Sequence, residues 1–352
     1  MISTTQHEQR AEEDYANLKE VGILAARDGI RWHRVDQLDS WDFSSFLPML
    51  EAANRQEIQV IWTLCHYGWP EGLDLLSAAF VKRFAQYCEA VARSVSDVNS
   101  EIPFYSPINE IAFLTYSIDK GYMHPYVRGR SAEVKRQLVR AALAGCEALW
   151  RVDPRARIVH VDPLIHVVPP RGRPDLAEAA AAQDASQFEV WDMLAGRRHP
   201  ELGGGPEFLD IIGVNYYHAN QWELPENRLC WEDTPRDDRW VPLHRLLAKL
   251  YERYKRPLFL GETSHFGVGR APWLREIVQE VVAGRNQGVP IDGICLYPII
   301  DRHDWEDLHH WHNSGLWDVI QDDQGGLQRV LNAEYAAELQ KAQQMVSSST
   351  NA

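Results

Sequence analysis

The sequence predicts an α/β fold in which a parallel sheet closes into a (β/α)8 TIM barrel, and three observations support this. Short apolar segments typical of buried strands alternate with amphipathic segments typical of helices along the chain. The chain has 352 residues and 45% hydrophobic content, which suits a barrel of this size. No low-complexity linker or internal repeat divides it. We therefore expect one barrel domain over residues 1–346 and a disordered tail at 347–352.

The expected strands are short and apolar, as buried parallel strands are. They cover Ile23–Trp32, Ile58–His66, Phe104–Glu110, Arg157–Asp162, Phe208–Tyr217, Pro257–Glu262 and Ile291–Tyr297. An eighth strand would have to precede the first helix, where only Met1–Gln6 is available. We therefore expect a barrel lacking its first β-strand, or truncated there, either because the chain begins at a late start codon or because another segment closes the barrel.

The expected helices follow from apolar spacing and from end signals. In the first, Tyr15, Leu18 and Val21 share one face and Gly22 ends the helix, whereas Asp153-Pro154 stops a later one. The helices cover residues 7–20, Asp42–Gln56, Ser77–Ser96, Ser131–Val152, Leu176–Leu194, Val241–Tyr254, Ala271–Gln287 and Leu327–Gln344.

Composition excludes several classes of partner. The net charge of −14 argues against nucleic acid, which favours a basic face. No apolar run reaches the roughly 20 residues of a membrane span, so we expect no membrane partner. The five cysteines are scattered and form no CxxC, which favours free thiols in a reducing cytoplasm. The sequence leaves the oligomeric state open.

Polar and aromatic side chains stand at the C-terminal ends of the expected strands, where barrel enzymes carry their chemistry. Two of them are glutamates, Glu110 and Glu262, on strands far apart in the chain. Cleavage of an acetal bond needs an acid for the leaving oxygen and a carboxylate facing the anomeric carbon. Long loops after Glu110, Tyr217 and Tyr297 hold most of the excess of aromatic residues and histidines, and aromatic rings pack on the apolar faces of sugars.

Five motifs at these strand ends resemble those of retaining (β/α)8 glycosidases, above all glycoside hydrolase family 1, the β-glucosidase-like enzymes. They stand in the family's order and cover Thr63–Pro70, Asn109–Ile111, Gly213–Tyr217, Gly261–Thr263 and Tyr297–Trp305. Arg31 falls where the clan keeps an arginine near its nucleophile. The likeness runs from about residue 8 to residue 340 and implies a small carbohydrate partner and no cofactor.

The resemblance assigns roles to individual residues. Glu110 would be the general acid/base, with a raised pKa, and Glu262 the nucleophile, about 5–5.5 Å away. Asn109 would hold the sugar 2-hydroxyl, while Tyr217 and Arg31 would orient Glu262 and keep it ionised. The remaining motif residues would bind substrate, and they are His66, Tyr67, Asn215, Tyr297, Asp304 and Trp305.

Alternatives remain at two points. The first is a metal cluster in one histidine-rich loop, formed by His303, Asp304, His309, His310 and His312. Its spacing matches no zinc signature, so we expect no metal there. The second concerns function, because a glycan-binding or accessory protein could keep the shape of the site after losing turnover. Asp304 and Tyr297 stand where the family has Glu and Trp, which leaves the preferred sugar open.

Overall fold

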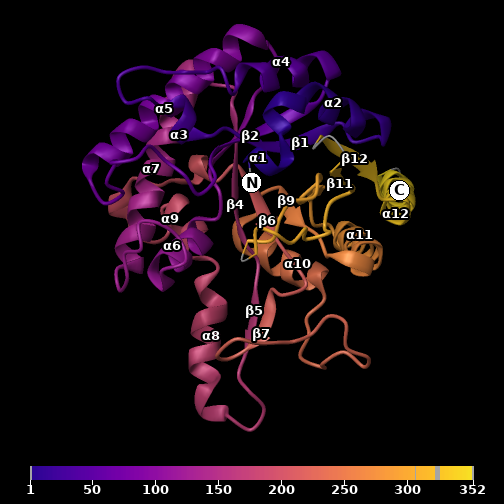
Figure 1. Cartoon of the computed structure of the whole chain (residues 1–352). Coiled ribbons are helices and arrows are strands. Elements are labelled where there is room, and N and C mark those ends of the chain that lie inside the picture. Colours follow the sequence, from indigo (N-terminus) through magenta and orange to yellow (C-terminus); the bar gives the residue numbers. More distant parts are fainter. Residues whose placement is uncertain (1, 306, 322–325, 351–352) are drawn as a thin grey trace. The chain divides into compact units, whose positions relative to one another are not determined.

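Seven strands form one sheet in the computed structural model, which describes residues 2–305, 307–321 and 326–350 (Figure 1). In spatial order they are β1 (Ala25–Gly29), β2 (Gln59–Cys65), β3 (Phe104–Ile108), β4 (Arg157–Pro163), β6 (Ile211–Asn215), β9 (Leu258–Thr263) and β10 (Ile291–Leu296). The pairs β1–β2, β2–β3, β3–β4 and β9–β10 are parallel. This order confirms the predicted (β/α)8 class. Ile2–Thr5, where an eighth strand could have stood, forms helix α1.

Contacts within the chain define two compact units. The N-terminal unit comprises Ala11–Pro163 and Ala185–Val214, and the C-terminal unit comprises the described residues of 1–10, 164–184 and 215–352. That the barrel forms a single domain stays a prediction.

The N-terminal unit holds β1 to β4, most of β6, the greater part of α2, which precedes β1, and the helices that follow these strands in the chain. These helices are α2 (His7–Glu20), α3 (Trp32–Val35), α4 (Leu47–Gln56), α5 (Ala78–Val98), α6 (Ile111–Lys120), α7 (Ser131–Val152) and α9 (Glu189–Leu194), with short 3-10 turns at Pro200–Leu202 and Pro206–Phe208. Helices α5 and α7 lie side by side (Figure 1). Trp32 stacks on Tyr87 of α5 at 5.5 Å between ring centroids, which anchors the start of α3 to the core.

The C-terminal unit holds β9, β10 and two smaller sheets, β5-β7-β8 and β11-β12. Its remaining elements are β5 (His166–Val168), α8 (Ala177–Ser186), β7 (Gln221–Glu223), β8 (Asn227–Arg228), α10 (Leu243–Tyr254), α11 (Arg270–Asn286), β11 (Trp317–Gln321), β12 (Leu327–Leu331) and α12 (Ala333–Thr350), with 3-10 turns at Pro174–Leu176 and Gly267–Gly269. Helix α11 packs along α12 (Figure 1), and Arg275 pairs with Glu338 between them at 2.7 Å.

Three expected elements differ from the structure. The helix expected at Leu327–Gln344 is wrong in its first turns, because Leu327–Leu331 pairs with β11 as a strand. Asn332 then begins α12 by accepting a hydrogen bond from the Tyr335 amide. The expected loop after Glu110 contains helix α6, and the expected helix Leu176–Leu194 is divided into α8 and α9.

Three further predictions concern the C-terminal tail, the cysteines and membrane-spanning segments. Helix α12 continues to Thr350, into the segment expected to be a loose tail, while residues 351–352 lie outside the described part. All five cysteines are free, as predicted. Among the described helices, none combines the length and the apolar character that crossing a membrane requires.

Candidate active site

Three predicted site residues of the N-terminal unit form a hydrogen-bonded chain. Asn109 follows β3 and is fully buried, and its side-chain amide donates to the hydroxyl of Tyr67 at 2.9 Å. The Tyr67 hydroxyl in turn donates to Oε2 of Glu110 in a short hydrogen bond. Asn109 also approaches Nε2 of His66 at 3.4 Å. The structure therefore brings His66, Tyr67, Asn109 and Glu110 together at the ends of β2 and β3.

This cluster also contains an arginine, Arg27, that was not expected from the sequence. Arg27 lies on β1 and donates to Oδ1 of Asn109 at 2.9 Å and to the Thr63 hydroxyl at 3.2 Å. Arg31 donates to the Gly29 carbonyl and to the sulfur of Met49. Arg27 lies within β1, in register with Ile61 of β2. The expected contact between Arg31 and Glu262 stays a prediction, because the two residues belong to different units.

Glu110 holds an unusual backbone conformation for its residue type. Its φ and ψ are 44° and 61°, in the left-handed region, and it stands at the start of α6. Its amide donates to the Val161 carbonyl of β4 at 2.9 Å. Strained backbone of this kind is most often held in place at functional sites. The side chain is only 9% exposed, so its carboxyl group is largely shielded from water.

Asp162 hydrogen-bonds to the first turn of α6. Its Oδ1 accepts a hydrogen bond from the Ala112 amide at 2.8 Å. Burial raises the pKa of Asp162 well above its ordinary value, and the charge of Glu110 adds to the rise, although the bond from Ala112 opposes it. The surroundings of Asp162 therefore favour its protonated form, beside Glu110.

The His66 ring stays neutral at ordinary pH. Desolvation by the surrounding protein lowers its pKa to about 3, and the charges of Arg27 and Arg31 act in the same direction. A neutral imidazole can both donate and accept one hydrogen bond, which suits recognition of a hydroxyl group.

The second glutamate lies in the C-terminal unit. Glu262 is near the end of β9 and is 4% exposed, and Tyr217 donates to its Oε2 at 2.7 Å, as expected for an orienting tyrosine. The Tyr216 amide donates to the Glu262 carbonyl at 2.9 Å, which fixes the two strand ends together. Glu110 and Glu262 belong to different units, and the expected 5–5.5 Å between their carboxyl groups stays a prediction.

Asn215, the last residue of β6, has an exposed fraction of zero. Neither polar atom of its side chain finds a hydrogen-bond partner among the residues that the structure describes. A buried amide without partners is costly, so the group is available for a ligand or a water molecule.

The predicted residues of the last strand-end motif lie around Arg302. Its guanidinium stands 5.3 Å from the ring centroid of Trp305 and 5.9 Å from that of Tyr297, and the Tyr297 amide donates to the Thr263 carbonyl. Asp304 lies 4.0 Å from Nε2 of His312. Trp305 remains 46% exposed, so one part of its ring is open to solvent.

One cysteine and three tryptophans have packing roles in the structure. Cys65 is fully buried and burial raises its pKa to about 12, which favours packing over nucleophilic chemistry. Trp32 and Trp62 are buried, as expected of packing residues. Trp231 packs on Trp273 at 5.2 Å between ring centroids, and its indole N–H donates to Glu276.

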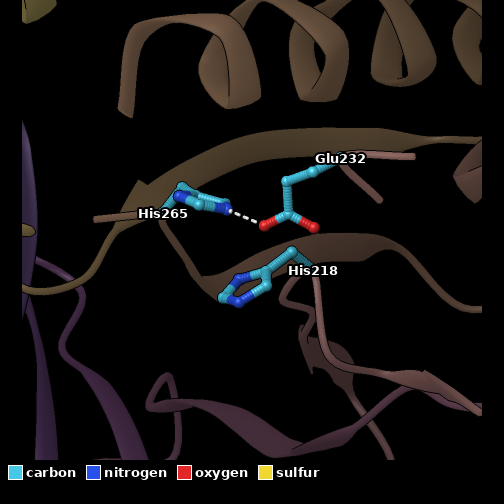
Figure 2. A group of neighbouring side chains, drawn as sticks. All are labelled: His218, Glu232 and His265. Carbon is cyan, nitrogen blue, oxygen red and sulfur yellow. Dashed lines mark hydrogen bonds and ion pairs between the residues drawn. The ribbon is translucent and has the colours of Figure 1, made fainter. Parts of the chain in front are cut away.

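A cluster of possible metal ligands in the C-terminal unit was not found from the sequence. His218, Glu232 and His265 each offer one ligand atom, and these atoms lie within 4.8 Å of one another (Figure 2). No other group of three or more such residues occurs in the described part of the chain, so the described residues of the histidine-rich loop do not gather into a ligand set. Burial lowers the pKa of His218 to about 4, with the charge of His265 as the next cause, so this imidazole is neutral.

The sequence matches no protein-family model and no curated protein. Many solved structures share its fold. A family 1 β-glucosidase from Thermotoga maritima is 15% identical, with a TM-score of 0.77 over 97% of this chain and 87% of that one. A β-glucosidase from the same organism in complex with glucoimidazole is 15% identical, with a TM-score of 0.78 over 97% and 88%.

A third solved structure is the virulence factor SghA in complex with its substrate analog salicin. It is 20% identical, with a TM-score of 0.77 over 96% of this chain and 86% of that one. At these identities the likeness establishes the fold. The family resemblance inferred from the five motifs is therefore confirmed in the architecture: this chain has the barrel fold of the family 1 β-glucosidases.

Proposed function

We propose that this protein is a retaining β-glycosidase that hydrolyses small β-glycosides by double displacement. The observation that carries the proposal is the matched environment of the two glutamates. Each stands at the end of a sheet strand, each is buried, and each accepts a hydrogen bond from a tyrosine hydroxyl, Tyr67 for Glu110 and Tyr217 for Glu262. The fold shared with β-glucosidases supports the same reading.

In the first step Glu110 gives its proton to the glycosidic oxygen while the Glu262 carboxylate attacks the anomeric carbon. The bond from the anomeric carbon to the leaving oxygen breaks, the aglycone departs as an alcohol, and a glycosyl ester of Glu262 remains. In the second step Glu110 takes a proton from water, whose oxygen attacks the anomeric carbon. The ester bond breaks and the free sugar leaves with its anomeric configuration retained.

The neighbouring residues position these two groups. Tyr217 would hold the Glu262 carboxylate toward the anomeric carbon, and Arg27 would fix Asn109 for contact with the 2-hydroxyl. His66, Asn215, Tyr297, Asp304 and Trp305 would complete the sugar site. The free cysteines support our proposal of a reducing, cytoplasmic location.

The test is a panel of 4-nitrophenyl β-glycosides assayed for release of nitrophenol. Glu262→Gln should abolish release from any glycoside that the protein cleaves. Glu110→Gln should lose far less on a nitrophenyl glycoside than on an alkyl glycoside, because nitrophenolate departs without a proton. Glu101→Gln, at an exposed glutamate, is the matched control and should keep full activity.

A crystal structure with glucoimidazole, which binds the Thermotoga maritima enzyme, would measure the separation of the two carboxyl groups. A separation near 5–5.5 Å supports the retaining mechanism, whereas one well above 10 Å would overturn it. If no glycoside in the panel is cleaved but glucoimidazole still binds, the protein is a glycan-binding protein on the same fold.

A further inference from the structure

We propose that His218, Glu232 and His265 form a binding site for a divalent transition-metal ion of the zinc class. The three residues lie in the C-terminal unit, in the turns after β6 and β9 and in the connection that follows β8. Figure 2 shows the two imidazole rings and the carboxylate turned toward one another. The site is distinct from the glycosidase chemistry, which needs no metal.

The distances suit a metal after small rotations of the side chains. Nε2 of His265 lies 2.9 Å from Oε1 of Glu232, and the rings of His218 and His265 are 4.2 Å apart at their centroids. Tetrahedral zinc with bonds of about 2.0–2.1 Å to nitrogen keeps its ligand atoms about 3.3–3.5 Å apart. The observed ligand atoms, all within 4.8 Å, need to move by little more than an ångström.

The hydrogen bonds of the two histidines leave a nitrogen available for the ion. Nδ1 of His265 accepts a hydrogen bond from the Phe266 amide at 2.9 Å and lies 3.1 Å from the Phe266 carbonyl, while Nε2 lies 2.9 Å from Oε1 of Glu232. An ion bound at Nε2 would displace the proton there, and Nδ1 could then carry a proton and donate it to the Phe266 carbonyl. Such a bond to a backbone carbonyl commonly fixes the tautomer of a ligating histidine. Nδ1 of His218 is buried and has no hydrogen-bond partner among the described residues.

Neighbouring residues hold the His265 ring in place. A Cβ added at Gly269 would lie 2.1 Å from Nδ1 of His265, so only glycine leaves room for the ring. The Phe266 ring stacks on the His265 ring at 4.7 Å between centroids, and the Trp231 ring lies 5.3 Å from it. Rigid placement of one ligand lowers the entropy cost of binding the ion.

Solvent access to the cluster and the type of its ligands both favour a transition-metal ion such as zinc. The Glu232 side chain is 50% exposed, so one side of the cluster is open to solvent for entry of the ion and for a fourth, water ligand. Imidazole nitrogens suit zinc, copper and nickel, whereas magnesium and calcium prefer oxygen ligands. The site should therefore select zinc over magnesium.

The proposed metal site is close in sequence to the proposed nucleophile. His265 is three residues after Glu262, and His218 directly follows Tyr217, which hydrogen-bonds to Glu262. An ion bound to both histidines would tie together the two segments that carry this pair. We expect it to stabilise the fold without taking part in bond cleavage.

The experiment titrates Zn²⁺ into the chelator-treated full-length protein by calorimetry. We expect one ion per chain, no heat with Mg²⁺ at the same concentrations, and a rise in Tm with Zn²⁺. His218→Asn and Glu232→Gln should each weaken zinc binding at least tenfold. Gly269→Ala should weaken it as well, because the new methyl group displaces the His265 ring.

A matched control is His199→Asn, which removes a histidine paired with a carboxylate, Glu201, at 2.9 Å but without a second histidine. Its zinc affinity should equal that of the wild type. The proposal is overturned if the wild type takes up no zinc, or if His218→Asn and Glu232→Gln bind zinc as the wild type does. Both outcomes are independent of glycosidase activity, so they do not bear on the proposed function.

Discussion

Tyr67 donates a hydrogen bond to Glu110, and both residues hold left-handed backbone, with φ of 65° and 44°. Each such conformation costs on the order of 1–3 kcal/mol for a residue other than glycine. Their pairing shows that the loop after β2 and the start of α6 are shaped around one carboxyl group. The strain is offset by the surrounding bonds, which run from Arg27 through Asn109 to Tyr67.

Replacing Tyr67 by phenylalanine should lower kcat/KM on a cleaved β-glycoside by about 10–100-fold. The variant loses the hydrogen bond to the Glu110 carboxyl group and leaves one buried Asn109 donor unpaired, which together cost about 1.5–3 kcal/mol. Steady-state kinetics provide the measurement, and Tyr122→Phe, at a tyrosine that is 70% exposed, is the control. Unchanged kcat/KM in Tyr67→Phe would show that the bond does not position Glu110.

Arg27 should be sensitive to replacement by lysine. Arg27→Lys should lower kcat/KM by about 10–100-fold, because a lysine cannot reproduce the guanidinium geometry that binds both Asn109 and Thr63. Arg93→Lys, at an exposed arginine paired with Glu89, is the control and should change it by less than about threefold. Equal losses in the two variants would contradict the assignment of Arg27 to the site.

Arg27 illustrates what the sequence could and could not predict. Local signals located whole elements: Gly22 and Asp153-Pro154 correctly marked the ends of α2 and α7. That Arg27 reaches Asn109 depends on the register of β1 against β2, and register is set by contacts distant in the sequence.

The same limit explains the errors at the C-terminal end and at the histidine cluster. Leu327–Leu331 becomes a strand because β11 pairs with it, which overrides the helical pattern. His218, Glu232 and His265 have no motif spacing, and only the fold brings them together. The one available signal was that both histidines closely follow strand-end motifs, at Tyr217 and Glu262.

The contact between α5 and α7 should be sensitive to a single methyl group. A Cβ at Gly145 would lie 2.9 Å from the ring of Phe84 and 3.0 Å from the sulfur of Cys88. Overpacking costs about 1–3 kcal/mol, which exceeds the gain of about 0.5–1 kcal/mol from replacing a helical glycine by alanine. Gly145→Ala should therefore lower the free energy of unfolding and reduce Tm by a few degrees.

Denaturant unfolding and calorimetry would measure this change. Gly293→Ala is the control, because nothing lies within 4 Å of an added Cβ there. A double variant that also carries Cys88→Ala should tolerate the new methyl group better, since the sulfur is gone. A Gly145→Ala protein as stable as the wild type would mean that the two helices can separate at no cost.

Asp162 should make the stability of the protein fall with rising pH. Its pKa is raised in the folded state, first by burial and then by the charge of Glu110, whereas the unfolded chain has an ordinary value near 3.9. Between the two values the folded protein holds a proton that the unfolded chain releases, so unfolding becomes easier as pH rises. The slope from this one group is about 1.4 kcal/mol for each pH unit in that interval.

Asp162→Asn keeps an oxygen for the Ala112 amide but removes the titration. Below pH 4 the free energy of unfolding of the variant should equal that of the wild type or be lower. Above pH 4 the difference should shift steadily in favour of the variant, as denaturant unfolding at a series of pH values would show. Asp153→Asn is the opposite control. Its hydrogen bond with Arg155 lowers the pKa of Asp153 in the folded state, so that variant should lose stability relative to the wild type above pH 4. If the difference between Asp162→Asn and wild type is constant with pH, Asp162 is ionised in the folded protein and the assigned proton is wrong.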